Sequence, residues 1–292
     1  MMRKCNACGH RYDEETWTCP ACGHAPGQIA GFPTMVEDSG VEHPREFDEE
    51  TYRQMTAYED GSFYITSRFD LMYWCFRRFF PDTKRFLDFG GGTGFWLEAL
   101  ATRHPEIDLF GSDLAVESLH NMKRRLGDKA TIFHTDAEHL PFDAHFDLIG
   151  SFDVVEHIED DIGVIEQFRP ALRDGGGIML TVPQHMSLWS VLDDKTGHKR
   201  RYVGDELARK VRKAGFDVLL DTSFMASLFV PQWISRRFMS QSADSVADTE
   251  HSLPGPLNAA FRAALVAELA TIKAGARYPF GGMRIVAARK LS

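Results

Sequence analysis

Short apolar runs alternate with amphipathic segments along most of the chain. The runs predict strands near residues 85–89, 107–112, 130–134, 146–152 and 176–182. Between most of them, apolar residues recur at helical spacing: Leu119, Met122 and Leu126; Ile158, Ile162 and Ile165; and Leu207, Val211 and Ala214. Strands that alternate with helices predict an α/β fold with a mostly parallel sheet covered on both faces.

The pattern extends in both directions from this region. An aromatic-rich stretch at 62–80 predicts a helix that ends at Pro81. After Gly215 we expect a strand at 216–223, two helices within 226–274 and a last strand at 282–289. The resulting domain prediction is a small unit at 1–26, a linker rich in Pro, Gly, Asp and Glu at 27–58, and a main domain at 59–292 with a helical insert at about 226–275.

Composition limits the function classes. A chain of 292 residues, 43% hydrophobic and 26% charged, suits one full-sized α/β domain plus a small unit. The net charge of -9 disfavours nucleic acid as a partner. There is no apolar run of the roughly 18 residues that a membrane span needs, and no apolar stretch follows the first charged residues, so we expect a cytoplasmic protein.

Four of the five cysteines lie within the first 22 residues. Cys5 and Cys8 form one CxxC pair and Cys19 and Cys22 a second, and a glycine follows each pair. This spacing is typical of tetrahedral zinc, with disulfides or free thiols as the alternatives. Because cysteine fills all four positions, we predict a structural zinc ribbon.

A glycine cluster follows the first strand of the main domain. Residues 85–95 read as a strand, then Gly90, Gly91, Gly92 and Gly94, then a helix. Glycines let the backbone turn sharply and approach a ligand at the carboxyl end of a strand. Phe95 stands where a dinucleotide-binding turn has its third glycine, which disfavours NAD.

Acidic residues end the next two predicted strands. Asp113 can accept hydrogen bonds from ribose hydroxyls. Asp136 can accept from an adenine amino group, while the backbone at Ala137 meets a ring nitrogen. The alternative for each acid is a helix cap. The fourth strand, 146–152, leads into Asp153-Val-Val-Glu-His-Ile.

Together these motifs resemble class I S-adenosylmethionine-dependent methyltransferases, most of all the quinone-biosynthesis branch. The matching segments are Leu87–Gly94, Asp113, Asp136-Ala137, Val155-Glu-His157 and Leu172–Gly176. The resemblance implies a Rossmann-like seven-stranded sheet with an antiparallel last strand and S-adenosylmethionine bound across the strand ends. It places Asp88 and Gly90 to Gly94 near the methionine part, Asp113 near the ribose, and Asp136 with Ala137 near the adenine.

The stretch Ser62–Arg68 resembles the entry helix of the same family. There Arg68 would meet the cofactor carboxylate, with a solvent-facing arginine as the alternative. The expected cofactor-binding set is completed by Tyr64, Leu114 and Phe152.

Methyl transfer to a hydroxyl benefits from a general base, and histidine is suited to that task. His157 follows the fourth strand, and His198 lies in the segment 197–202 after the fifth strand. We expect His198 and Tyr202 on the acceptor side and His157 as a further residue lining the site. The alternatives are that His157 packs against the cofactor or caps a helix, and that Lys199–Arg201 form a solvated basic face.

The apolar insert, including 224–234 and 257–272, predicts a lid over an apolar or aromatic acceptor, a peripheral membrane contact, or ordinary core. The leading function is O-methylation of a small molecule. The alternatives are an RNA base methyltransferase that uses the ribbon to grip RNA, and a non-catalytic cofactor-binding scaffold. The sequence indicates neither the acceptor nor an oligomeric state.

Overall fold

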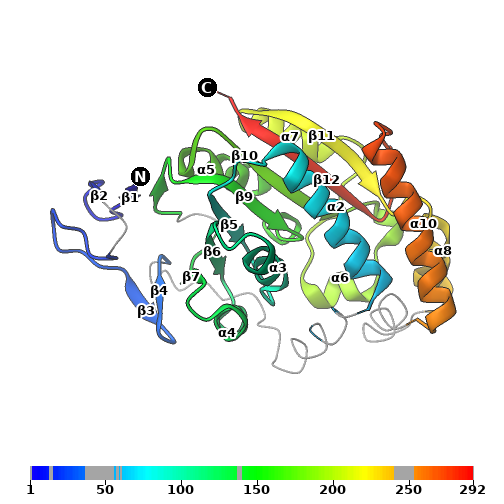
Figure 1. Ribbon diagram of the computed structural model, residues 1–292, viewed down its shortest axis with the longest axis horizontal. Helices are drawn as coiled ribbons and strands as arrows, with labels where there is room; N and C mark the ends of the chain where they lie inside the picture. The colour runs from blue at the N-terminus through cyan, green and yellow to red at the C-terminus, as the bar shows by residue number, and fades with distance from the viewer. Residues whose placement is uncertain are drawn as a thin grey trace.

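The computed structural model describes residues 2–12, 16–36, 56, 59, 61–136, 140–239 and 253–291. A nine-stranded sheet with the order β11-β12-β10-β9-β5-β6-β7-β4-β3 runs through the molecule (Figure 1). Its strands are β3 (Gly27–Ile29), β4 (Phe32–Thr34), β5 (Arg85–Phe89), β6 (Asp108–Asp113), β7 (Ala130–His134), β9 (Phe146–Phe152), β10 (Leu172–Pro183), β11 (Phe216–Phe224) and β12 (Met283–Lys290).

The direction of the strands confirms the predicted fold class. Strands β7, β6, β5, β9 and β10 pair in parallel, with β5 in the centre. The last strand, β12, is antiparallel to both β10 and β11. The carboxyl ends of the parallel strands therefore meet at one edge, which is where open α/β sheets bind ligands.

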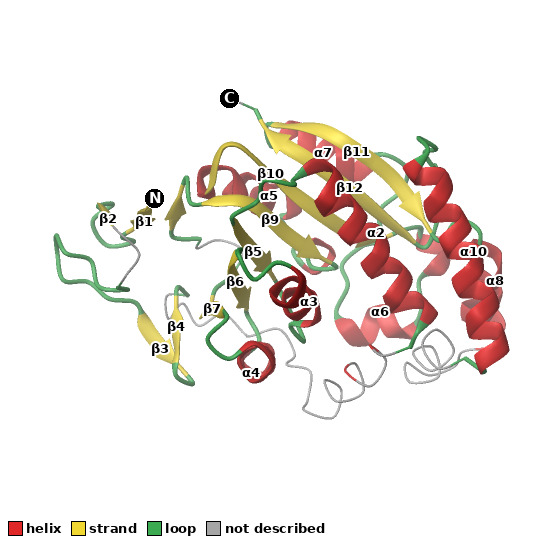
Figure 2. Cartoon of the chain, in the orientation of Figure 1, coloured by secondary structure: helices red, strands yellow, loops and turns green. Residues whose placement is uncertain are grey.

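Helices cover both faces of the sheet (Figure 2). They are α2 (Phe63–Phe79), α3 (Phe95–Arg103), α4 (Val116–Leu126), α5 (Asp161–Ala171), α6 (Val191–Thr196), α7 (Glu206–Lys213), α8 (Phe229–Ile234) and α10 (Gly255–Lys273), with short helices η1 (Val155–His157), η2 (Met186–Leu188) and η3 (Ser235–Met239). Successive strand residues point to opposite faces. Phe86 and Leu148 pack with α2, α3, α4 and α10, whereas Leu87 and Ile149 pack with α5 and α7.

Helix α5 departs from the predicted pattern. It begins at Asp161, because Asp160 caps it by accepting from the backbone N–H of Gly163 at 2.9 Å. Ile158 therefore precedes the helix. The buried face is formed by Val164, Ile165 and Phe168 rather than by the predicted Ile158, Ile162 and Ile165.

The N-terminal segment joins the main domain through strands. In the small sheet β2-β1-β8, strand β1 (Met2–Lys4) lies between β2 (Arg11–Tyr12) and β8 (Phe142–Asp143) of the main domain. Strands β3 and β4 lie within the stretch that we expected to be a linker, and they extend the central sheet beyond β7. Most of the remaining linker lies outside the described residues, and the domain boundaries stay a prediction.

The insert before β12 packs against the entry helix at the opposite end of the molecule from β1 and β3 (Figure 1). Helix α10 lies along α2. Its Asn258 accepts from the backbone N–H of Phe63 at 2.9 Å and donates to the carbonyl of Gly61 at 3.0 Å. Asn258 thus caps α2 from another helix, because Ser62 makes no side-chain cap hydrogen bond.

Among the helices in the described part of the chain, none combines the length and the apolar composition needed to cross a bilayer.

We expect Asn258→Ala to lower the free energy of unfolding by about 1 kcal/mol, because the first turn of α2 loses the acceptor for one of its N–H groups. Urea denaturation followed by circular dichroism measures the change. Gln167→Ala, which removes an exposed amide on α5, is the control. Equal stability of the Asn258→Ala protein and the wild type would show that the contact does not act as a cap.

Candidate functional site

The glycine turn after β5 is tied to the neighbouring strand. Gly90 and Gly91 donate backbone hydrogen bonds to the carbonyl of Ser112 at 2.9 and 3.0 Å. Gly90 has a φ of 74°, and a Cβ there would lie 2.4 Å from a methyl of Val154. Only glycine fits this position, so the turn stays close to the sheet edge.

A cavity of about 370 Å³ opens beside this turn. Its wall is made by α2, the glycine turn, the segments after β9 and β10, and η3. Of the residues that the sequence predicted to bind cofactor, the following line it: Tyr64, Arg68, Asp88, Gly90, Gly91, Gly92 and Phe152. His198 lines the same cavity, so the structure brings predicted cofactor and acceptor residues together.

Asp88, near the end of β5 just before the glycine turn, is a buried carboxylate with a raised pKa. Its side chain is buried, and its Oδ1 has no hydrogen-bond partner among the described residues. Burial, reinforced by the charge of Asp113, raises the pKa of Asp88 to about 8. A cationic ligand group in the cavity would give this carboxylate the partner it lacks.

Asp113 caps the turn that follows β6. It accepts from the backbone N–H groups of Ala115 at 2.9 Å and Gly92 at 3.0 Å. Burial raises its pKa and these hydrogen bonds oppose the shift, with a net rise. Helix α4 has Ala115 at its N-cap and no side-chain cap, so Asp113 is not the helix cap of the alternative. The predicted ribose contact is compatible with its two hydrogen bonds, because a carboxylate offers more than two lone pairs.

The remaining predicted cofactor residues lie at neighbouring strand ends. Gly94 begins α3 with a φ of 79°. Leu114 follows Asp113, and Asp136 is half-buried beyond β7. None of these, nor Asp113, is among the residues that line the cavity. Ala137 lies outside the described residues.

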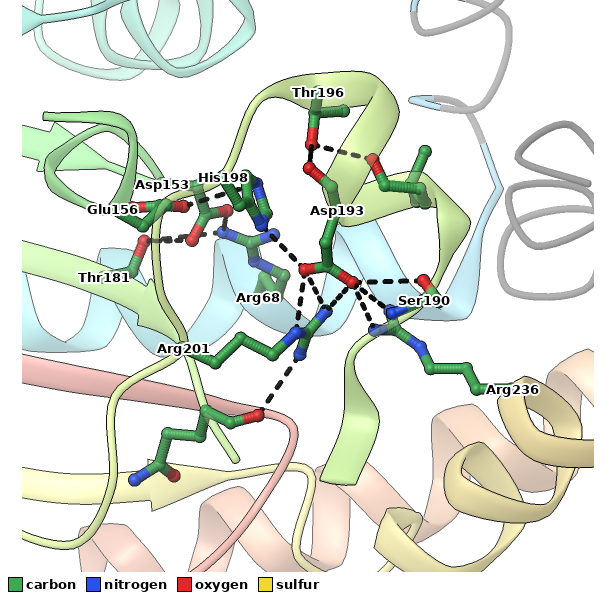
Figure 3. Close-up of polar contacts among 12 residues, drawn as sticks. Arg68, Asp153, Glu156, Thr181, Ser190, Asp193, Thr196, His198, Arg201 and Arg236 are labelled. Atoms are coloured by element: carbon green, nitrogen blue, oxygen red, sulfur yellow. Dashed lines mark hydrogen bonds and ion pairs between the residues drawn. The ribbon is translucent and has the colours of Figure 1, made fainter. Parts of the chain in front are cut away.

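Arg68 reaches across the cavity to the carboxyl ends of β9 and β10. It forms an ion pair with Asp153 and donates to Thr181 Oγ1 at 3.4 Å (Figure 3). Burial disfavours the charged guanidinium, but Asp153 and Tyr64 together outweigh burial and raise the pKa of Arg68. Arg68 is thus directed into the site and is not the solvent-facing arginine of the alternative.

His198 is held by a buried carboxylate. Its Nδ1 lies 2.7 Å from Oδ1 of Asp193, and its Nε2 lies 3.9 Å from Oε1 of Glu156 (Figure 3). Burial alone would raise the pKa of Asp193. The hydrogen bond from His198 and the charges of Arg201 and Arg236 instead hold it well below its usual range.

Asp193 is the centre of this cluster. Ser190 N donates to its Oδ2 at 2.9 Å in a capping box at the start of α6. Arg201 donates Nε at 2.7 Å and Nη2 at 3.0 Å, one to each carboxylate oxygen. Arg236, from η3 in the insert, places Nη1 3.6 Å from Oδ2. Three separate segments thus fix the orientation of the carboxylate that holds His198.

The two other predicted catalytic residues differ in their surroundings. His157 is not among the residues that line the cavity, so the expectation that it lines the site is corrected. It packs behind His198 with 4.7 Å between ring centroids, and burial together with His198 lowers its pKa to about 4. Tyr202 is buried in the core, and its hydroxyl donates to Asp161 at 2.6 Å. Tyr202 does not line the cavity, so the expectation that it faces the acceptor is corrected by the structure.

Sequence reasoning missed several residues of the site, among them Glu156, Asp193 and Arg236. Arg201 was expected only as part of a solvated basic face, but it is buried. The Ser190-x-x-Asp193 spacing of a capping box was a usable signal for Asp193. Glu156 belongs to the motif Val155-Glu-His157, in which the sequence predicted no role for it. Its side chain is fully buried, neither carboxyl oxygen has a hydrogen-bond partner among the described residues, and burial followed by the charge of Asp153 raises its pKa well above the usual value.

Among the described residues, two groups of side chains have the donor atoms for a metal ion. At the N-terminus, Sγ of Cys5 lies 3.7 Å from Sγ of Cys22, and Sγ of Cys8 lies 3.8 Å from Sγ of Cys19. Tetrahedral zinc with Zn–S bonds of about 2.3 Å separates its sulfurs by about 3.8 Å, so the spacing fits zinc. In the cavity region, one ligand atom from each of Glu156, His157 and His198 lies within 4.8 Å of the others.

Comparison with known proteins is consistent with this geometry. The curated "Ubiquinone biosynthesis O-methyltransferase" of Idiomarina loihiensis is 30% identical over 112 residues, which cover 36% of this chain and 45% of that protein. The "Biotin biosynthesis bifunctional protein BioHC" of Cellvibrio japonicus is 30% identical over 146 residues, covering 47% of this chain and 28% of that protein. The chain thus spans less than half the length of either relative.

Solved structures share the fold. A chain from the complex of the Haloferax volcanii Trm112 methyltransferase activator with a methyltransferase has a TM-score of 0.56 at 16% identity, covering 84% of this chain and 95% of that one. The [4+2]-cyclase SpnF has a TM-score of 0.52 at 23% identity, covering 76% and 80%. A family model described as a methyltransferase domain matches residues 67–220, more than half of the 292 residues. The chain therefore belongs to the methyltransferase domain family.

Proposed function

We propose that the protein is an S-adenosylmethionine-dependent methyltransferase that methylates a hydroxyl of a small-molecule acceptor. The observation that carries the proposal is that one cavity is lined both by the glycine turn with Asp88 and by the Asp193–His198 pair. A proposed cofactor site and a candidate base thus share one cavity. The fold by itself does not specify the reaction, since it also supports a cyclase.

The residues at the glycine turn fit the cofactor. S-adenosylmethionine supplies a methyl group activated by a sulfonium, and its methionine part carries an ammonium group. We assign that ammonium to Asp88, because Oδ1 of this buried carboxylate has no hydrogen-bond partner within the described ranges. Asp113 is assigned to the ribose, and Asp136 with Ala137 to the adenine. Tyr64 and Arg68 line the same wall and are kept as contacts of the methionine part.

The hydrogen bonds around His198 define its protonated nitrogen. The ionised Asp193 can only accept, so the proton of a neutral His198 is on Nδ1 and is donated to Asp193. The lone pair is then on Nε2. Nε2 can take the proton of an acceptor hydroxyl, and the Asp193 carboxylate stabilises the imidazolium that forms. His157 is kept as a neighbour that limits the orientation of the His198 ring.

The acceptor side combines an apolar wall with this polar cluster. Leu192 and Met283 line the same cavity as His198 and Arg201. An acceptor with an aromatic or aliphatic body and one hydroxyl fits these surroundings. The main task of the protein is then to hold the hydroxyl oxygen in line with the methyl group, because proximity and orientation supply much of the rate in such displacements.

We further propose that the four N-terminal cysteines bind one structural zinc ion. Their sulfur spacing supports this, and so does the φ of 71° at Gly9 and 72° at Gly23, which forms the turn after each pair. Four cysteine ligands leave no open coordination position, so we assign the ion no part in the reaction.

Binding of S-adenosylhomocysteine is expected to tighten as the pH rises from 6 to 8. Asp88 must lose its proton before it pairs with the ammonium group, and below a pKa of about 8 this costs up to roughly tenfold in affinity per pH unit. Titration calorimetry measures the dependence, and Asp88→Asn should abolish it. Asp108→Asn, at an exposed carboxylate, should leave the slope intact. An unchanged slope in Asp88→Asn would refute the assignment.

The purified protein is expected to contain about one zinc ion per chain by mass spectrometry of the metal content. The double variant Cys8→Ser/Cys22→Ser should lose most of it, because two thiolate ligands are removed. Cys75→Ala, at a buried cysteine in α2, should retain it. Metal content far below one equivalent in the wild type would remove the zinc from the proposal.

Labelled methyl groups from S-adenosylmethionine should enter the small-molecule fraction of a metabolite extract and not an RNA fraction. His198→Ala is expected to lower this transfer by about 100- to 10,000-fold through loss of the base, while S-adenosylhomocysteine binds normally. Lys199→Ala, at the exposed neighbour, is the control. Label in the RNA fraction would favour the alternative in which the ribbon binds RNA. Full activity of the His198→Ala protein would show that His198 is not the base.

A further inference from the structure

A chain of hydrogen bonds links the N-terminal segment to the strand ends assigned to the nucleoside half of the cofactor. We call residues 2–12 and 16–36 the N-terminal unit. Within it, Thr34 at the end of β4 pairs with His134 at the end of β7. The backbone N–H of Met35 donates to the carbonyl of His134 at 2.9 Å. The unit thus contacts the main domain two residues before Asp136.

His134 is the centre of this link. Its side chain is buried, with 1% of the residue's surface exposed. One ring nitrogen, Nε2, lies 2.9 Å from the carbonyl of Leu114, and the other, Nδ1, lies 2.7 Å from Oγ1 of Thr34. A carbonyl only accepts, so Nε2 carries the proton and Nδ1 of the neutral ring accepts from the Thr34 hydroxyl. The donor and the acceptor are therefore defined in both hydrogen bonds of the His134 ring.

The link reaches the acid at the end of β6. Leu114 directly follows Asp113, and Asp113 pairs with His134 between β6 and β7. The backbone N–H of Thr135 also donates to the carbonyl of Asp113 at 3.3 Å. A side chain that fixes the Leu114 carbonyl thus limits how far the Asp113 strand end can move relative to β7.

The N-terminal unit contacts the main domain a second time, through residues that follow Asp136 in the chain. Arg3 and Met2 pair with Phe142 and Asp143, and the backbone N–H of Lys4 donates to the carbonyl of Pro141 at 3.0 Å. Trp17 packs against Phe133 and Phe142, with ring centroids 5.9 and 6.4 Å apart. The N-terminal unit therefore contacts the chain both before and after Asp136.

From these contacts we propose that the N-terminal unit is part of the cofactor site, in which Thr34 and His134 are positioning residues for the Asp113–Leu114 and Asp136 strand ends. The inference rests on the proposed function, because it concerns the same cofactor. Neither residue touches the cofactor in this proposal. Their hydrogen bonds keep the two strand ends in the geometry that binds the nucleoside, so that less ordering is needed on binding.

Two ligands separate the nucleoside half of the site from the methionine half. S-adenosylhomocysteine contains both halves, whereas 5′-methylthioadenosine has the adenine and ribose without the amino acid. Thr34→Val removes the hydroxyl and keeps the shape. It is expected to weaken both ligands by a similar factor, about fivefold, which corresponds to one lost hydrogen bond. Titration calorimetry well below the unfolding midpoint of each variant measures the affinities.

Three matched variants complete the test. Thr34→Ser retains the hydroxyl and should bind both ligands like the wild type. Thr131→Val makes the same exchange elsewhere on β7 and should also bind normally. Asp88→Asn should weaken S-adenosylhomocysteine but not 5′-methylthioadenosine. His134→Gln, which can replace only part of the link, should weaken both ligands and gives a second reading if Thr34→Val folds poorly.

The outcomes distinguish the two proposals. If the wild type binds both ligands and Thr34→Val binds 5′-methylthioadenosine equally well, the positioning role is refuted and the proposed function stands. Loss of affinity in Thr34→Ser as large as in Thr34→Val would also refute it, because the hydroxyl would then not be the cause. If the wild type binds neither ligand at millimolar concentration, the proposed function fails and the positioning role fails with it.

Discussion

The parallel pairing of β5 with its two neighbours is the constraint on which the site depends. It brings the carboxyl ends of β5, β6 and β9 to one edge of the sheet, and the glycine turn is hydrogen-bonded to Ser112 at that edge. Asp88 is buried there because it belongs to the central strand. A carboxylate in that position, with one oxygen unpartnered, is costly in the protein alone. A cationic ligand beside Asp88 would offset this cost, so the position of Asp88 in the fold favours the binding of one.

The part of the cavity around His198 is held together by charged side chains rather than by strand pairing. There a single carboxylate, Asp193, is shared by a histidine and two arginines from separate segments. A buried group with this many charged partners stabilises one arrangement only when all of them are present. His198, the segment after β10 and the insert are therefore coupled through Asp193, and the geometry of His198 depends on residues far away in sequence.

The sequence predicted the central sheet and the glycine turn, because these follow from local periodicity and glycine spacing. The antiparallel direction of the last strand was predicted only from the resemblance to class I methyltransferases. The sequence also predicted that His198 lies at the site, because His198 is in the segment that follows the end of a strand. It could not predict Arg236 or Asn258, since their roles arise from contacts with segments more than 40 residues away in the chain. Tyr202 was misplaced for a related reason: position in a loop near the sheet edge does not determine side-chain direction, and its hydroxyl is used by Asp161. The strands at 27–34 were missed because they are three residues long and gain their stability from β7.

Helix α10 and the segment before it contact two parts of the cavity wall, helix α2 and the surroundings of Asp193. Through Asn258 and through Arg262, which pairs with Asp70, it is attached to α2, the helix that carries Tyr64 and Arg68 into the cavity. The same insert supplies Arg236, which lines the same cavity. Replacement of this insert by another sequence during evolution would thus change the support of α2 and the surroundings of Asp193 in one event, even where the glycine turn is unchanged.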